Sequence, residues 1–269
     1  ASHPLAEMTN LKKLKEDSKL QPFIIKGSEG LSDRLGVALG YTNAVYFARK
    51  SHFITVLVPA PGQTARQLLV DFAADKREGR SEAENTSRMQ NAFKRFGLFL
   101  ARFHRETRSP GSLLGYVHGD LNPGNVVLDP GVDGMGTVAT LIDLETMAPS
   151  LTTPRSGLDD LLRFLPHSVA HATDSSFMSS KSLDVWMSVF VKPFLQGYIS
   201  AIPVDTVSPL SAQRGGFIAE LTGTFNNAGF VSLLRKQGTV YHFATWNRYK
   251  EQIIAFLSTQ AFKETPFVP

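Results

Sequence analysis

The stretch that decides the fold runs from residue 117 to residue 128 and reads Val-His-Gly-Asp-Leu-Asn-Pro-Gly-Asn-Val-Val-Leu. Asp120 comes just after an apolar strand, inside a turn that the neighbouring glycine and proline residues favour. Such a turn holds a side chain rigidly at a surface. Asn125 follows five residues later and adds a neutral amide oxygen.

A second stretch, residues 141–145, reads Leu-Ile-Asp-Leu-Glu. Asp143 follows the apolar run from Val138 to Ile142, so we expect it to emerge from the end of a buried strand. Asp120, Asn125 and Asp143 then place three oxygen-bearing side chains on neighbouring strand ends. Phosphoryl transfer needs such a set, namely one base and two magnesium ligands.

The distribution of charged residues along the chain also indicates a site for a metal ion. No Lys or Arg occurs between Ser109 and Pro154, whereas that segment contains five carboxylates, Asp120, Asp129, Asp133, Asp143 and Glu145. Carboxylates that converge without a local cation repel one another. The segment therefore predicts a site for a hard divalent cation such as Mg²⁺, and acidic loops exposed to water are the alternative.

The loop from His118 to Asn125 resembles the catalytic loop of the protein-kinase-like superfamily. Its His-Gly-Asp form is similar to the aminoglycoside and choline phosphotransferase branch and to bacterial sugar and lipopolysaccharide kinases. Residues 141–145 resemble the Asp-Phe-Gly motif of that branch. The resemblance implies that Asp120 is the catalytic base and that Asn125 and Asp143 bind Mg²⁺. It covers residues 93–145 firmly, including the helix that ends at His104.

The resemblance implies an α+β, bilobal fold, with a small β-rich N-lobe for the nucleotide at residues 1–58 and a larger α-helical C-lobe at residues 59–269. The pattern of residues agrees with this order. It predicts strands at 21–26, 44–48, 52–58, 125–128 and 138–142, and helices at 28–40, 63–74, 89–105 and after residue 158.

The N-lobe resembles the family less closely. Phe23-Ile24-Ile25-Lys26 resembles the strand that carries the phosphate-binding lysine, which makes Lys26 the candidate for binding ATP phosphates. An ordinary lysine at a strand end is the alternative. Val58 lies in the segment expected to act as the hinge that contacts the adenine edge. The phosphate loop of the family is glycine-rich, but the segment from Ala1 to Gln21 contains no glycine.

Two further acidic positions echo the family. An Asp-Leu pair that opens a helix and braces the catalytic loop is best matched by Asp160, with Asp159 as the alternative. An acidic pair favoured by the helix dipole would explain both residues without any such role. The segment beginning at Asp184 offers a second, less suitable match. His167 and His171, four residues apart, have no third partner in sequence and are interpreted as surface residues.

Composition excludes several classes. The chain has 269 residues, no cysteine and a formal net charge of +4. Disulfides, thiol catalysis and cysteine-ligated metals are therefore excluded. So small an excess of positive charge argues against a nucleic-acid partner, and the apolar runs are too short for a membrane span. We expect a cytoplasmic protein, in the producing cell or in a host cell if it is delivered as an effector.

The sequence thus predicts an ATP- and Mg²⁺-dependent phosphotransferase. Asn122 occupies the position where protein kinases usually have lysine, which favours a small or sugar-like acceptor hydroxyl over a protein. An effector-type protein or lipid kinase is one alternative. A pseudokinase that only binds is another, supported by the absent glycine-rich loop. A metallophosphoesterase is disfavoured, because no Asp-x-His motif occurs.

Overall fold

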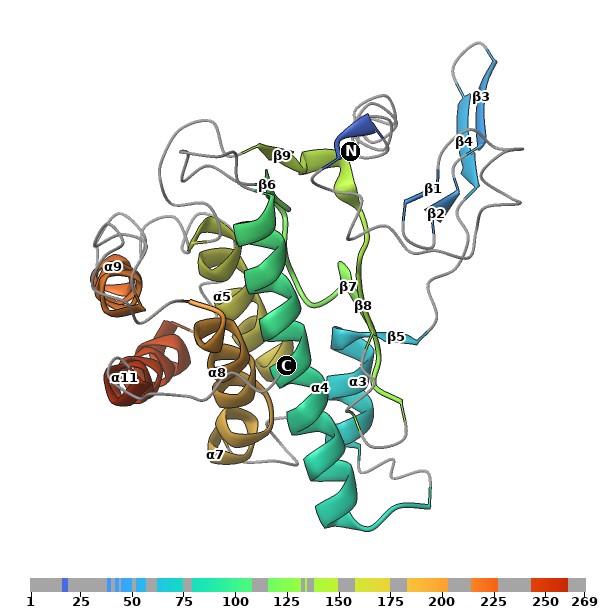
Figure 1. The fold of residues 1–269 in the computed structure, drawn as a ribbon. Coiled ribbons are helices and arrows are strands. Elements are labelled where there is room, and N and C mark those ends of the chain that lie inside the picture. The colour runs from blue at the N-terminus through green and yellow to red at the C-terminus, as the bar shows by residue number, and fades with distance from the viewer. Residues whose placement is uncertain are drawn as a thin grey trace.

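The computed structural model describes residues 16–18, 38–39, 42–43, 45–49, 52–56, 62–74, 79–107, 116–131, 134, 138–149, 158–174, 183–202, 214–226 and 243–260. Within these ranges the chain is α+β, mostly helical, with one small three-stranded antiparallel sheet (Figure 1). No helix in these ranges combines the length and the apolar character that crossing a membrane requires.

The helices are α3 (Ala65–Ala73), α4 (Glu82–Glu106), α5 (Leu158–Asp174), α7 (Leu183–Trp186), α8 (Lys192–Ser200), α9 (Arg214–Phe225) and α11 (Phe243–Gln260). A π-helical turn, Met187–Val191, joins α7 to α8, and a 3₁₀ turn spans Leu144–Thr146. The strands are β1 (Ala38–Leu39), β2 (Thr42–Asn43), β3 (Val45–Arg49), β4 (His52–Val56), β5 (Gln63–Thr64), β6 (Tyr116–Val117), β7 (Val126–Asp129), β8 (Val138–Leu141) and β9 (Ala148–Pro149).

Helix α4 is the central element of the helical part, and it begins earlier than the sequence predicted. Its first turn is closed by a capping box, in which Ser81 Oγ accepts from Glu84 N and the Glu84 carboxylate accepts from Ser81 N. This reciprocal pair satisfies backbone donors that would otherwise lack partners. The helix predicted over 89–105 therefore begins at Glu82, inside a stretch that reads as merely polar.

Helices α4 and α8 cross at very short range. A Cβ added at Gly97 would collide with the backbone of Phe194, and one added at Gly197 would collide with the backbone of Lys94. The missing side chains let the two backbones touch. Rings of Phe96 and Phe194 stack beside the crossing, with centroids 5.3 Å apart. This packing fixes the C-terminal end of α4, which lies against the candidate site.

The three-stranded sheet has the order β5-β7-β8, and every pairing is antiparallel. Val126 pairs with Leu141, so Asn125 and Ile142 meet at the same end of the ladder. Strands β6 and β9 form a separate two-stranded pair. The strands predicted at 125–128 and 138–142 and the helix predicted at 63–74 are confirmed to within two residues.

Strands β3 and β4, predicted at 44–48 and 52–58, pair as an antiparallel hairpin, with Val45 opposite Val56. The end of the helix predicted over 28–40 is wrong, because residues 38 and 39 pair instead with residues 42 and 43. Pairing with the segment that follows immediately satisfies their backbone groups without a helix. The remainder of that helix, the strand predicted at 21–26 and the boundary between residues 58 and 59 lie outside the described residues.

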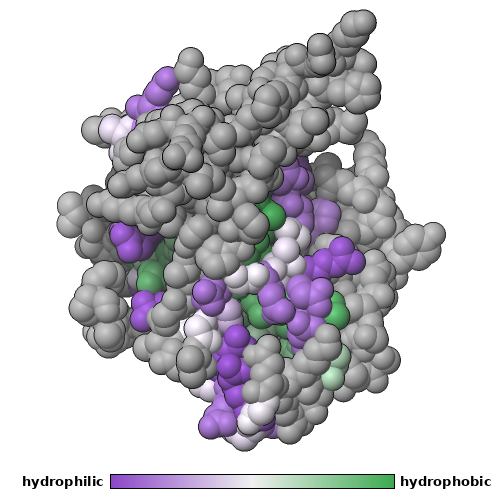
Figure 2. Space-filling view, turned by 90° about the vertical axis from the view of Figure 1, so that its right-hand side faces the viewer, coloured by the Kyte–Doolittle hydropathy of each residue, from purple (hydrophilic) through white to green (hydrophobic). Residues whose placement is uncertain are grey.

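Figure 1 shows β1 to β4 on one side of the molecule and helices α8, α9 and α11 on the other, with α4 between them. Figure 2 shows the side that carries β1 to β4. Among the residues that are coloured, hydrophilic ones predominate at its foot, and hydrophobic ones are recessed between hydrophilic ones nearer the middle.

Candidate active site

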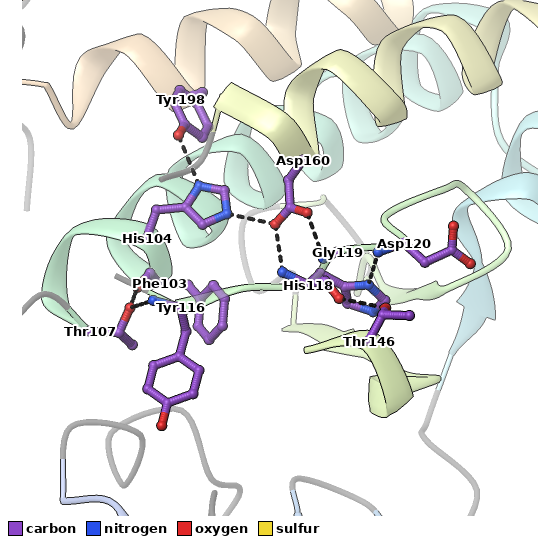
Figure 3. A network of polar contacts seen from close by, with 10 residues as sticks. All are labelled: Phe103, His104, Thr107, Tyr116, His118, Gly119, Asp120, Thr146, Asp160 and Tyr198. Atoms are coloured by element: carbon purple, nitrogen blue, oxygen red, sulfur yellow. Dashed lines mark hydrogen bonds and ion pairs between the residues drawn. The ribbon is translucent and has the colours of Figure 1, made fainter. Parts of the chain in front are cut away.

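A buried carboxylate on α5 accepts hydrogen bonds from the backbone of the loop between β6 and β7. Asp160 Oδ2 accepts from His118 N at 2.8 Å, and Asp160 Oδ1 accepts from Gly119 N at 2.9 Å (Figure 3). The Asp160 side chain has no exposed surface. The prediction that Asp160 braces the loop backbone is confirmed.

A histidine and a tyrosine complete the surroundings of Asp160. His104, near the end of α4, donates from Nε2 to Asp160 Oδ2 at 2.9 Å, because a carboxylate can only accept. Its Nδ1 lies 2.9 Å from the Tyr198 hydroxyl on α8. Burial alone would raise the pKa of Asp160, but the His104 hydrogen bond and the His118 backbone hold that pKa below its ordinary value. The brace is therefore an ionised carboxylate within the core.

The loop is also tied to the strand that precedes Asp143. His118 is buried, and its Nε2 lies 2.8 Å from the carbonyl oxygen of Ile142. A carbonyl only accepts, so the proton is on Nε2, and Nδ1 accepts from Asp120 N at 3.3 Å. The His118 ring therefore holds both the backbone N–H of Asp120 and the carbonyl oxygen of Ile142, the residue before Asp143.

Gly119 has a left-handed backbone conformation within the loop. Its φ is +81°, and an added Cβ would lie 2.6 Å from the carbonyl oxygen of Thr146. On the other side, Thr146 Oγ1 donates to the carbonyl oxygen of His118 at 2.8 Å. The left-handed backbone and the close approach both require glycine.

Two asparagine amides close the turn after Asp120. Asn122 Oδ1 accepts from Gly124 N at 2.9 Å, while Asn122 Nδ2 donates to the carbonyl oxygen of Asp120 at 3.2 Å. Asn125 Nδ2 donates to the same carbonyl oxygen at 2.9 Å. These bonds fix the Asn125 amide with its nitrogen turned toward the loop, and its Oδ1 takes no hydrogen bond from the residues that the structure describes.

Asp143 has backbone dihedral angles that residues other than glycine rarely adopt. Its φ and ψ are 58° and 61°, and among the described residues it is the one non-glycine residue with a positive φ. Its side chain is exposed. Such backbone strain tends to occur where a side chain is held for function. Ile142 N donates to the carbonyl oxygen of Asn125 at 3.0 Å, so Asp143 follows directly on the residue that contacts Asn125.

The structure thus brings Asp120, Asn125 and Asp143 to one end of the β7-β8 ladder. Lys26 and Val58 lie outside the described residues, so their roles stay predictions. Within the described ranges, no group of three or more His, Asp or Glu residues could hold a metal ion. Any magnesium site in this part of the chain would therefore use fewer than three of these side chains and would take its other ligands from amide, phosphate or water oxygens.

Sequence reasoning missed a cation beside Asp120. Arg163, on α5, places Nη1 3.5 Å from Asp120 Oδ1, and both side chains are a little over two-fifths exposed. His167, four residues further along α5, has a pKa lowered first by burial and also by Arg163, against an opposing effect of Asp120. The signal was available, since Arg163 follows Asp160 by three residues and so shares its helix face.

Comparison of the chain with protein-family models, with curated proteins and with solved structures gives no match. A function is therefore inferred from the contacts within the site.

Proposed function

We propose that this chain is an ATP- and Mg²⁺-dependent phosphotransferase with a two-lobed, protein-kinase-like fold. One observation carries the proposal. Asp120 presents its carboxylate from a loop whose backbone is held by Asp160, and Asn125 and Asp143 stand at the adjoining strand end. A base on a fixed loop backbone, with two oxygen ligands for a metal ion at the adjoining strand end, is the arrangement that phosphoryl transfer requires.

Each residue has a separate task. Asp120 accepts the proton of the acceptor hydroxyl as that oxygen forms its bond to the γ-phosphorus and the bond to the β-phosphate oxygen breaks, releasing ADP. Asn125 Oδ1 and the Asp143 carboxylate would hold Mg²⁺, and the ion would offset the negative charge of the phosphates. One amide and one carboxylate suit this ion, because it usually keeps water and phosphate oxygens as its other ligands.

The buried residues keep the base in place. Asp160, fixed by His104, holds two successive N–H groups of the loop, and His118 fixes the next one, at Asp120. Preorganised groups of this kind avoid the cost of reorganisation during the reaction. Because ATP and Mg²⁺ are its reagents, we place the reaction in the cytoplasm, of the producing cell or of a host.

The deciding experiment compares Asp120→Asn with Asp184→Asn, an exposed aspartate on α7. Labelled ATP is offered with a panel of hydroxylated acceptors, and ATP–Mg²⁺ binding is measured by calorimetry. We expect Asp120→Asn to lower transfer by roughly 10²–10⁴-fold, the usual cost of losing a general base, with ATP affinity nearly unchanged. The control variant should match the wild type. Transfer at the wild-type rate by a folded Asp120→Asn protein would refute the mechanism.

Two further variants test the nucleotide side. Asp143→Ala should weaken ATP binding only when Mg²⁺ is present, because it removes a ligand of the ion. Lys26→Ala should weaken ATP binding with or without Mg²⁺, because it removes a direct phosphate contact. ATP–Mg²⁺ should also raise the melting temperature of the wild type, since only the folded state binds it.

A pseudokinase is the second candidate, because residues 1–21 contain no glycine with which to form a phosphate loop. Tight ATP binding without transfer to any acceptor would favour it. Absence of nucleotide binding altogether would refute both candidates.

A further inference from the structure

Beside the proposed base, the acceptor side of the site carries a cation that the mechanism above does not use. The Arg163 guanidinium lies 3.5 Å from Asp120 Oδ1, whereas Asn125 contacts the same residue at its backbone carbonyl oxygen. Arg163 therefore approaches the carboxylate, where the acceptor hydroxyl must lie. In Figure 3 that carboxylate points away from His104 and Tyr198, with the ribbon of α5 above it.

The bond between Arg163 and Asp120 leaves most of the guanidinium free to bind another group. A charge-assisted N–H···O bond is usually about 2.7–2.9 Å long, whereas this contact measures 3.5 Å and involves one nitrogen. Asp120 is the single ion-pair partner of Arg163 among the residues that the structure describes. A guanidinium has five N–H donors and suits the bidentate geometry of a carboxylate or phosphate.

The loop itself supplies no competing cation. Both ends of the Asn122 amide are used within the turn, at Gly124 N and at the carbonyl oxygen of Asp120. No Lys or Arg occurs from Ser109 to Pro154. His167, the other basic residue on this face of α5, has a pKa lowered by burial and by Arg163, and is therefore neutral near pH 7. Among the residues that the structure describes, Arg163 is thus the permanently charged cation beside the base.

Transfer itself would leave Arg163 without its partner. When Asp120 takes the proton from the acceptor hydroxyl, its carboxylate becomes neutral, and the guanidinium then needs another anion. A cationic acceptor, such as an amino sugar, would be repelled at this position. From this geometry we infer that the acceptor is a small hydroxylated molecule bearing a phosphate or carboxylate group, which Arg163 binds. The inference rests on the proposed phosphotransferase function.

The test uses four acceptors of one carbon skeleton: a hexose, its 6-phosphate, the corresponding uronic acid and the corresponding amino sugar. The kcat/KM of each is measured for the wild type, for Arg163→Gln and for Arg102→Gln. Arg102 is a matched control, because it is an exposed arginine on α4 whose ion pair, with Glu106, does not involve the loop.

We expect the wild type to prefer an anionic acceptor over the neutral hexose by roughly tenfold to a hundredfold, as for hydrogen bonds to charged groups. Arg163→Gln should abolish most of that preference, mainly through KM for the acceptor, and leave KM for ATP within about twofold. Arg102→Gln should keep the preference. Comparison of the 6-phosphate with the uronic acid identifies the anionic group.

The inference would be overturned if the wild type preferred the neutral sugar or the amino sugar, or if it preferred a serine-containing peptide over all four acceptors. It would also be overturned if Arg163→Gln lowered kcat/KM equally for every acceptor and lowered ATP hydrolysis by water to the same extent. The last would assign Arg163 to the transferred phosphoryl group.

A binding measurement keeps the inference testable if no acceptor is phosphorylated, which would count against the proposed function. The hexose 6-phosphate and inorganic phosphate are titrated into each protein, with and without saturating ATP–Mg²⁺. Both anions should bind the wild type and Arg102→Gln more tightly than Arg163→Gln. Equal binding to all three proteins would refute an anion site at Arg163.

Discussion

Asp160 and Asp120 belong to one site, only 40 positions apart in the chain, yet their surroundings are opposite. Asp160 has no exposed side-chain surface and accepts from two backbone N–H groups and from His104, all within 2.9 Å. Asp120 is 44% exposed, and its one ion pair with a described residue measures 3.5 Å. Asp160 stabilises the fold, because the protein itself fills its hydrogen-bonding positions. Asp120 keeps most of its hydrogen-bonding positions open and can therefore act on a substrate.

The largest expected effect separates these two carboxylates by stability. Asp160→Ala should lower the free energy of unfolding by about 3–5 kcal/mol, because it leaves His104 and two loop N–H groups buried without an acceptor. Asp120→Ala should change it by less than about 1 kcal/mol, because exposed ion pairs contribute little. Urea denaturation of both variants measures the difference. Equal losses in the two would show that the contrast in burial has no energetic consequence.

The next effect concerns the loop that Asp160 holds. Gly119→Ala and Gly131→Ala both place a side chain at a positive φ, +81° and +60° respectively. Each should lose about 1–2 kcal/mol for the left-handed backbone. Gly119→Ala should lose more, because its Cβ would press on the carbonyl of Thr146, whereas nothing lies within 4 Å of a Cβ at Gly131. Similar urea midpoints for both variants would contradict a tightly packed loop.

A smaller effect tests how far the held region extends toward β6. Thr107 is buried; its Oγ1 donates to the carbonyl oxygen of Phe103 and accepts from Tyr116 N at 2.9 Å. Thr107→Val should cost about 1–2 kcal/mol, because Tyr116 N loses its acceptor. Thr259→Val is the control, since that hydroxyl makes similar bonds on an exposed surface of α11. If the two variants lose the same free energy of unfolding, the tightly hydrogen-bonded region around the loop does not extend to Tyr116.

The smallest effect is the response to acid. The pKa of Asp160 is lowered in the folded state, so its stabilisation is complete above the ordinary pKa of 3.8 and is lost as the pH falls toward the folded value. Between pH 6 and pH 3 the wild type should therefore lose more stability than Asp160→Asn, which has no carboxylate to protonate there. Denaturant titrations at several pH values measure both slopes. Parallel slopes would mean that Asp160 is not the ionised brace.

Local patterns accounted for much of the fold. The hairpin of β3 and β4, the strands β7 and β8 and the core of α4 all follow from short-range alternation or helical spacing, which neighbouring residues set by themselves. Composition at the start of α4 hid the capping box, because Ser81 and Glu84 look like ordinary surface residues until a helix exists between them. The pairing of Ala38 with Asn43 was likewise decided by partners rather than by local propensity.

For the site, the sequence by itself determined the turn at Asp120, the position of Asn125 within it and the strand that leads to Asp143, because each depends on residues only a few positions apart. The sequence left Asp159 as an alternative to Asp160 for bracing the loop, and the tertiary structure decided between them; it also decided that Arg163 contacts the base. Those choices join residues about 40 positions apart, as in the contacts of Asp160 with His118 and of Arg163 with Asp120. They depend on how α5 lies against α4 and the loop, a placement set by packing across the core, where spacing along the chain carries little information.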